Sequence, residues 1–316
     1  MAPTDPAPGP RTPSLGSIEV VEVSPRDGLQ NEDVTFSTRD KVDLIDSAVD
    51  AGIRRIEVAS FVNPHRVPQM ADGEAVVAAL RRRDEVTYIG LVLNLVGLHR
   101  AAEAGLSQIN AVVVCTDTFG TKNQGVTWEQ SIDVWAEIAE AARRAGITPT
   151  VTISVAFGCP YEGEVSIDRL VDVARAAAES GPVEIALADT IGVAVPTDTM
   201  RRIGAVRSAL DDSGHGNITL RGHFHNTRNT GLASAWAAVQ AGVSALDASL
   251  GGIGGCPFAP KATGNIPTED LVYLLERAGV STGLDLAALV GTVEWLETKL
   301  GRAVPGLLAK AGPFPP

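Results

Sequence analysis

The stretch Thr219-Leu220-Arg221-Gly222-His223-Phe224-His225 has the composition of a strand and ends in two histidines separated by one residue. Successive side chains of a strand point to opposite faces, so His223 and His225 share one face and can approach the same ion. On a helix, the same convergence needs a spacing of three or four residues. An isolated pair of this kind is more often a polar patch on a half-exposed strand. Residues at the other strand ends distinguish a metal-binding pair from a polar patch.

Three further segments rich in residue types typical of active sites also follow strand-like runs. They are Arg26-Asp27-Gly28, Ala188-Asp189-Thr190 and Gly254-Gly255-Cys256. In a closed barrel of parallel strands, the active site is built from residues at the strand ends. The four segments together therefore favour one shared site over four unrelated turns.

From residue 18 onward, short β-branched runs alternate with longer alanine-rich, amphipathic stretches. This alternation is typical of a parallel sheet with crossover helices. The predicted strands are 18–23, 55–59, 87–93, 108–115, 148–156, 183–188, 219–225 and 245–249. The predicted helices between them include 37–51, 128–145, 166–180, 197–209 and 229–241.

An open doubly wound sheet would show the same local alternation. However, no Gly-x-Gly-x-x-Gly motif follows the first predicted strand, and Ser24-Pro25-Arg26-Asp27-Gly28 offers no phosphate cradle. We therefore predict a (β/α)8 TIM barrel over residues 17–266, after a flexible proline-rich leader over 1–16. Additional C-terminal helices in 267–316 could cap the barrel or mediate oligomerisation. Their predicted ranges are 271–278 and 284–300.

Composition limits the partners and the compartment. The net charge is −12, and the only basic tract is Arg81-Arg82-Arg83, which argues against nucleic acid as a partner. No apolar run approaches the roughly 20 residues that cross a bilayer, so no membrane partner is expected. The leader has no apolar core segment typical of a signal peptide. Three widely spaced cysteines argue against a disulfide framework and favour the reducing cytoplasm.

Asp27 directly follows the first predicted strand, where its carboxylate could join His223 and His225 on a divalent cation. Oxygen and imidazole ligands without a thiolate suit Mg²⁺ or Mn²⁺, and Zn²⁺ is also compatible with them. An aspartate in a Pro-Arg-Asp-Gly turn is more often a turn former. The adjacent Arg26 favours the ligand interpretation, because a guanidinium there can stabilise an oxyanion that develops near the metal.

Two more carboxylates occupy strands. Glu57 is a lone carboxylate in the apolar part of the second predicted strand, where burial is costly without a partner. In a barrel it would point inward with Arg26 as its partner, and a solvent-facing edge position is the alternative. Asp189 ends the apolar run 185–188 and could orient a metal ligand, shuttle a proton or cap the next helix.

The most distinctive motif is Gly251-Gly252-Ile253-Gly254-Gly255-Cys256-Pro257-Phe258-Ala259, followed by Ala262-Thr263-Gly264-Asn265. Four glycines in five positions predict a mobile loop that can fold over a bound substrate. Packing does not need a thiol at the tip of such a loop, so we predict that Cys256 is reactive. Cys115 and Cys159 lack that setting and are assigned to packing.

These segments resemble the 3-hydroxy-3-methylglutaryl-CoA (HMG-CoA) lyases. This family belongs to the metal-dependent lyase and Claisen-condensing barrels that share an Arg-Asp signature after the first strand. The resemblance spans residues 18 to about 300. It is carried by Val21-Glu22-Val23-Ser24-Pro25-Arg26-Asp27-Gly28-Leu29-Gln30-Asn31-Glu32, Ser60-Phe61-Val62-Asn63-Pro64 with Val67-Pro68-Gln69-Met70, Phe157-Gly158-Cys159-Pro160-Tyr161-Glu162-Gly163, Asp189-Thr190-Ile191-Gly192, His223-Phe224-His225 and the loop with Cys256.

The resemblance implies a role for each residue that matches the family pattern. Arg26 would lie near the reacting oxygens, with Gln30 also contacting substrate, and Glu57 would hold the site in place. Cys256 would donate or accept a proton. The implied cation ligands are Asp27, His223, His225 and Asn265.

The chain departs from the family pattern at two places close to the expected substrate position. Asn226-Thr227-Arg228-Asn229 stands where many of these lyases have an aspartate-threonine-tyrosine run. Asp33 occupies a position that is often lysine. Both departures bear on the identity of the substrate more than on the type of reaction.

The resemblance and the residue set predict retro-Claisen cleavage of a 3-hydroxyacyl-CoA such as HMG-CoA, which would give acetyl-CoA and a keto acid, acetoacetate. The cation would chelate substrate oxygens and lower the pKa of the hydroxyl. A base, either His223 or Asp189 acting through water, would take the hydroxyl proton. Arg26 would stabilise the thioester enolate, and Cys256 would protonate it, since a thiol with a pKa of about 8.5 suits this task.

Three alternatives compete with this prediction. The nearest is a lyase or aldolase of the same group that acts on another 3-hydroxyacyl-CoA or keto acid. A Claisen-condensing acyltransferase is less consistent, because those enzymes usually carry further C-terminal sequence and lack this cysteine loop. A noncatalytic metal-binding scaffold would have no use for the thiol or for Arg26. We expect a small-molecule acyl-CoA as the substrate and, on family grounds, a homodimer.

Overall fold

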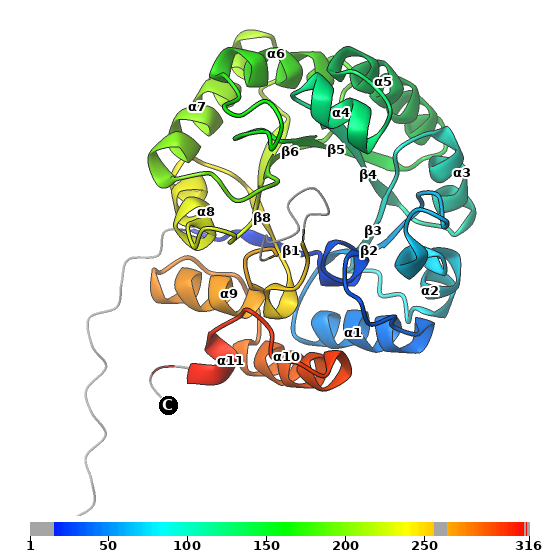
Figure 1. Ribbon diagram of the computed structural model, residues 1–316, viewed down its shortest axis with the longest axis vertical. Coiled ribbons are helices and arrows are strands. Elements are labelled where there is room, and N and C mark those ends of the chain that lie inside the picture. The colour runs from blue at the N-terminus through cyan, green and yellow to red at the C-terminus, as the bar shows by residue number, and fades with distance from the viewer. Residues whose placement is uncertain (1–15, 256–263, 313, 315–316) are drawn as a thin grey trace, which may run out of the picture.

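Eight parallel strands close into a barrel in the order of the sequence, with β8 hydrogen-bonded to β1 (Figure 1). The computed structural model describes residues 16–255, 264–312 and 314. Closure confirms the predicted (β/α)8 barrel and excludes the open sheet. The strands are β1 (Glu19–Glu22), β2 (Arg55–Ser60), β3 (Thr87–Leu91), β4 (Gln108–Val114), β5 (Thr148–Ser154), β6 (Glu184–Asp189), β7 (Thr219–Phe224) and β8 (Ala245–Ala248).

Helices surround the barrel and cover its outer face (Figure 1). They are α1 (Thr38–Asp50), α2 (Gly73–Ala79), α3 (Leu95–Glu103), α4 (Asp117–Asn123), α5 (Trp128–Arg144), α6 (Ile167–Ala178), α7 (Pro196–Asp212), α8 (Gly231–Gln240), α9 (Thr268–Arg277), α10 (Leu286–Leu300) and α11 (Leu308–Ala311). Short helical turns are η1 (Ser24–Gly28), η2 (Pro68–Met70) and η3 (Leu250–Gly252). No helix in the described ranges is long and apolar enough to cross a membrane.

Capping side chains start several of these helices. Ser37 and Asp40 form a reciprocal capping box at α1, and Thr127 and Gln130 form one at α5. Each box satisfies backbone N–H groups that the first helical turn leaves without partners. The amphipathic helices then bury their apolar faces against the barrel, as Trp135 of α5 shows, being almost fully buried.

The C-terminal helices extend the outer ring. In Figure 1, α9 lies beside α8, and α10 lies between α9 and α1. The backbone N–H of Asp285, which caps α10, donates to the carbonyl of Ala51 at the end of α1. The helices predicted at 271–278 and 284–300 are thus present and packed on the barrel.

Strand register determines which side chains meet inside the barrel. In the pairing of β7 with β8, His223 lies opposite Asp247. Side chains alternate along a strand, so Arg221 shares the face of His223 one pleat earlier on β7. The barrel interior beside β7 and β8 therefore holds Arg221, His223 and Asp247 close to one another.

Candidate active site

The residues after β1 form a tight π-helical turn, η1, which carries Arg26 and Asp27. The carbonyl of Val23 accepts hydrogen bonds from the backbone N–H groups of Arg26, Asp27 and Gly28, at 3.2, 2.8 and 3.1 Å. A Cβ on Gly28 would lie 2.8 Å from side-chain atoms of both Ile253 and Ser249. Only a glycine allows this approach, so the turn lies directly against the segment that follows β8.

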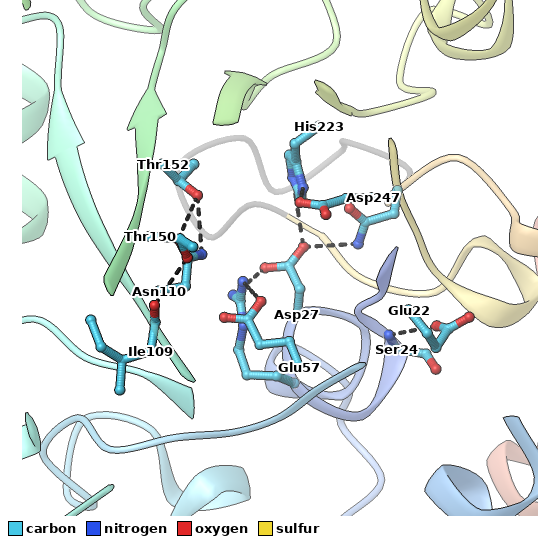
Figure 2. Close-up of polar contacts among 12 residues, drawn as sticks. Glu22, Ser24, Asp27, Glu57, Ile109, Asn110, Thr150, Thr152, His223 and Asp247 are labelled. Atoms are coloured by element: carbon cyan, nitrogen blue, oxygen red, sulfur yellow. Dashed lines mark hydrogen bonds and ion pairs between the residues drawn. The ribbon is translucent and has the colours of Figure 1, made fainter. Parts of the chain in front are cut away.

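Asp27, His223 and His225 converge at the mouth of the barrel. The Asp27 Oδ2 atom lies 4.0 Å from His223 Nε2 and 3.9 Å from His225 Nε2. One ligand atom from each residue falls within 4.8 Å of the others. Among the described residues, these three form the cluster of histidine and carboxylate side chains that could hold a metal ion. Figure 2 shows Asp27 pointing towards His223. The spacing leaves room for one ion between a carboxylate and two imidazoles.

Asn265 completes the set of possible ligands. Its Nδ2 donates to Asp27 Oδ2 at 2.8 Å, and its backbone pairs with that of His225. Its Oδ1 is buried and has no hydrogen-bond partner among the described residues. A buried acceptor without a partner is costly. Because a cation would satisfy it, the residues present fit a divalent cation bound by oxygen and imidazole ligands.

Electrostatics keep two of the possible ligands, Asp27 and His225, in suitable charge states. Burial opposes ionisation of Asp27, but Arg26 and the two histidines outweigh it, so the pKa of Asp27 lies well below its usual range. Burial, followed by the neighbouring charge of His223, lowers the pKa of His225 to about 4. Asp27 is therefore an anion and His225 a neutral imidazole near pH 7.

The structure adds Asp247, which the sequence analysis missed. Its Oδ2 lies 3.0 Å from His223 Nδ1, and the residue is 4 % exposed. Burial disfavours a charged imidazole, but the hydrogen bond and charge of Asp247 outweigh this effect and raise the pKa of His223. Asp247 is a lone carboxylate in an apolar strand, which is the signal that singled out Glu57. Applied to β8, the same signal would have found it.

Arg26 connects two carboxylates. Its Nη1 donates to Asp27 Oδ1 at 2.5 Å and its Nη2 to Glu57 Oε2 at 2.8 Å. Burial works against the charged guanidinium, but Asp27 and Glu57 outweigh it and raise the pKa of Arg26. Glu57 thus points inward, as expected for a barrel position. The pair fixes the guanidinium beside the possible cation site.

A cavity of about 550 Å³ opens at this end of the barrel. Its lining includes Gln30 and, on the wall opposite Asp27, Asn110 and Thr152 (Figure 2). The exposed cationic residues Arg66 and Lys122 also line it. The cavity therefore combines the possible cation site with positive charge on its solvent side.

Asp189 holds the turn that leads into α7 and does not itself cap that helix, whose N-cap is Val195. Its two carboxylate oxygens accept from the backbone N–H groups of Val193 and Ala194, at 2.8 and 2.9 Å. Neighbouring Ala188 and Thr190 line the cavity, whereas Asp189 is absent from its lining. The carboxylate stabilises the turn after β6.

Two of the three cysteines, Cys115 and Cys159, lie among the described residues. Cys256 lies outside the described residues. Cys115 is buried, and burial raises the pKa of its thiol to about 12. Cys159 is also buried, and its Sγ accepts from Thr116 Oγ1 at 3.1 Å. Both environments fit the assignment of Cys115 and Cys159 to packing.

The two departures from the family pattern occupy different surroundings. Arg228 Nη1 donates to the carbonyls of Ile191 and Gly192, at 2.8 and 3.0 Å, and so ties the loop after β7 to the loop after β6. Asp33 is exposed. Arg228 is thus engaged in holding the loops of the barrel mouth together.

Two buried glutamates hold the start of the glycine-rich segment. Glu22 is fully buried and accepts from the backbone N–H of Ser24 at 2.8 Å, the N–H of Leu250 at 3.1 Å and the hydroxyl of Thr268 at 2.7 Å. Glu269 Oε2 accepts from the N–H of Gly251 at 3.0 Å. These bonds join the turn with Asp27 to both flanks of residues 256–263.

Comparison with known proteins identifies the type of enzyme. An (R)-citramalyl-CoA lyase of Chloroflexus aurantiacus is 43 % identical over 96 % of this chain and 97 % of its own length. The hydroxymethylglutaryl-CoA lyase YngG of Bacillus subtilis is 36 % identical over 91 % of this chain and 95 % of its own. With the barrel and its site, these relatives show that the protein is a carbon–carbon lyase of the TIM-barrel class.

The chain belongs to the HMGL-like family, whose model matches residues 17–295. A solved HMG-CoA lyase from Acinetobacter baumannii, in complex with coenzyme A and 3-methylmalate, superimposes with a TM-score of 0.89. It is 40 % identical and covers 95 % of this chain and 96 % of that chain. The family resemblance drawn from the sequence is confirmed.

Glu269 should make stability depend on pH. Burial raises its pKa from the usual 4.5 to about 8, so between these values the folded protein holds a proton that the unfolded chain releases. This contribution to stability is complete below pH 4.5 and is lost as the pH rises through about 8. In Glu269→Gln, which mimics the protonated side chain, the urea midpoint should exceed that of the wild type by a margin that grows from pH 5 to pH 8.5. A margin independent of pH would contradict the assignment.

Proposed function

We propose that the protein cleaves a 3-hydroxy-3-methylglutaryl-CoA-like thioester by a divalent-metal-dependent retro-Claisen reaction, releasing acetyl-CoA and a keto acid. For HMG-CoA itself the keto acid would be acetoacetate. The observation that carries the proposal is the convergence of Asp27, His223 and His225 beside Arg26 in one cavity. The lyases similar to this chain support it.

The cavity suits an acyl-CoA. Arg66 and Lys122 on its exposed side can attract the phosphates of coenzyme A, and Gln30 and Asn110 offer hydrogen bonds to an acyl chain with polar groups. A cavity of about 550 Å³ falls within the usual size of small-molecule sites.

Four residues would hold the cation, which we expect to be Mg²⁺ or Mn²⁺, with Zn²⁺ as a further candidate. They are Asp27, His223, His225 and Asn265. When bound, such a cation polarises substrate oxygens and makes a hydroxyl more acidic.

The remaining chemistry falls to side chains around this site. Arg26, held by Glu57, offers its guanidinium to the enolate oxygen that develops on cleavage. Of the two bases considered from the sequence, Asp189 does not line the cavity, and His223 would have no free nitrogen once Nε2 holds the cation and Nδ1 pairs with Asp247. We therefore assign the hydroxyl proton to neither, and it would pass to water. Cys256 would protonate the enolate. Gly255, the residue before it, lines the cavity.

A second substrate, (R)-citramalyl-CoA, is favoured by a specific observation. The lyase of that name shares 43 % of its residues with this chain, and the HMG-CoA lyase YngG shares 36 %. The two thioesters require the same carbon–carbon bond cleavage and differ in the branch that carries the free carboxylate.

The decisive assay measures acetyl-CoA release from a panel of 3-hydroxyacyl-CoA thioesters that includes HMG-CoA and citramalyl-CoA. We expect turnover of at least one of them with Mn²⁺ and none after chelation. Asp27→Asn should lower turnover by roughly 100-fold or more, because it removes the anionic ligand. A protein that binds Mn²⁺ and cleaves no member of the panel would favour the noncatalytic scaffold.

Cys256→Ser tests the thiol separately. A hydroxyl is a far weaker acid than a thiol at neutral pH, so turnover should fall by about two orders of magnitude or more. Mn²⁺ affinity should stay within twofold of the wild type, since no thiolate belongs to the ligand set. Unaltered turnover would remove Cys256 from the mechanism. Cys159→Ser, in a packing position, serves as the matched control.

We infer a homodimer and a cytoplasmic location from the family resemblance and the cysteine pattern. An apolar groove between α8, α9 and α11, lined by Trp236, Tyr273 and Leu308, offers a surface for the second subunit. Light scattering of the purified protein should give twice the mass of the chain, 32.9 kDa. A monomer at micromolar concentration would refute the dimer and leave the lyase proposal intact.

A further inference from the structure

A line of buried charges runs through the barrel interior to His223. Arg55 of β2 donates to Glu184 of β6 through Nη2–Oε1 and Nη1–Oε2 bonds of 2.9 and 3.1 Å. Glu184 Oε1 lies 3.2 Å from Nε of Arg221 on β7. Arg221 Nη1 lies 3.4 Å from Asp247 Oδ1, and Asp247 Oδ2 lies 3.0 Å from His223 Nδ1. The two oxygens of Asp247 thus have different partners.

We propose that Arg221 is a positioning residue for the cation site and acts through Asp247 on the orientation of His223. The proposal rests on the cation site put forward above. The Arg221 guanidinium attracts Oδ1 of Asp247 as an ion pair, without a hydrogen bond to that oxygen, and so favours the carboxylate rotation that directs Oδ2 at Nδ1 of the imidazole. The Nε2 atom of His223 then faces Asp27. An acceptor on the far nitrogen of a ligating histidine sets both its ring orientation and its tautomer.

Strand geometry supports this chain of contacts. His223 and Asp247 are register partners on neighbouring strands, and Arg221 precedes His223 by one pleat on the same face of β7. No turn or loop intervenes, so the three side chains are placed by the hydrogen-bonded strands of the barrel. A site supported in this way keeps its ligands within a narrow range of geometry.

Stability alone gives a poor account of these charges. Arg221 is 2 % exposed, so its guanidinium has lost nearly all contact with water. Its Nε atom has an ion-pair neighbour in Glu184, but neither Nε nor Nη2 has a hydrogen-bond partner among the described residues. Buried ion pairs often stabilise a fold no better than apolar side chains of similar volume. A role in orienting His223 explains why Asp247, one carboxylate of this ion-pair network, forms a hydrogen bond with the imidazole.

The experiment measures Mn²⁺ affinity by titration calorimetry on the full chain. Arg221→Met should weaken binding about tenfold, the lower end of the range for residues that support metal ligands. Asp247→Asn should weaken it at least as much. Arg55→Met is the matched control, because Arg55 shares Glu184 with Arg221 and, although its charge also helps to lower the pKa of Asp247, no hydrogen bond or ion pair within the described ranges joins it to that carboxylate. It should leave the affinity within twofold of the wild type.

A double variant separates positioning from general damage. If Arg221 acts through Asp247, adding Arg221→Met to Asp247→Asn should weaken Mn²⁺ binding no further. Additive losses, an equal loss in Arg55→Met or an unchanged affinity in Arg221→Met would each overturn the proposal. Should Arg221→Met fail to fold, the same comparison is made with Arg221→Lys and Arg55→Lys. A wild-type protein that binds no Mn²⁺ would instead overturn the cation site and the proposed function with it.

Discussion

The carboxylate of Asp27 is the point at which the separate parts of the site meet. One oxygen accepts from Arg26, and the other accepts from Asn265 and faces both histidines. These partners come from the turn after β1, the end of β7 and the segment after β8. They can meet only because the sheet closes. An open sheet would leave the first and last strands apart and would scatter the same residues.

Much of this arrangement could be predicted from the sequence. The alternation of β-branched and alanine-rich runs located all eight strands, with ends that differ from the structure by no more than two residues. The spacing of His223 and His225 placed both on one face, because a strand repeats every two residues. These features depend on local periodicity, which a sequence carries directly.

Other parts of the site could not be predicted, because they depend on strand register and loop path. Asp247 itself carries the signal of a lone carboxylate in an apolar strand, but its contact with His223 depends on the register of β7 against β8, which no local pattern fixes. Glu22 was identified only as part of a family motif. Its carboxylate in fact accepts hydrogen bonds from Leu250 and Thr268, which lie more than two hundred positions away in the sequence. Asp189 shows the reverse case. A carboxylate at a strand end suggested chemistry, while the actual backbone turn uses both of its oxygens.

The position of β8 has a consequence for how the protein is made. Asp247 and Asn265 belong to its last strand and to the segment beyond it, whereas Asp27 belongs to the turn after the first strand. A nascent chain on the ribosome therefore lacks Asn265, the last of the proposed ligands, until more than four-fifths of its 316 residues have been synthesised. Under the proposed function, the cation would therefore be acquired late in biosynthesis, after the ends of the barrel have joined.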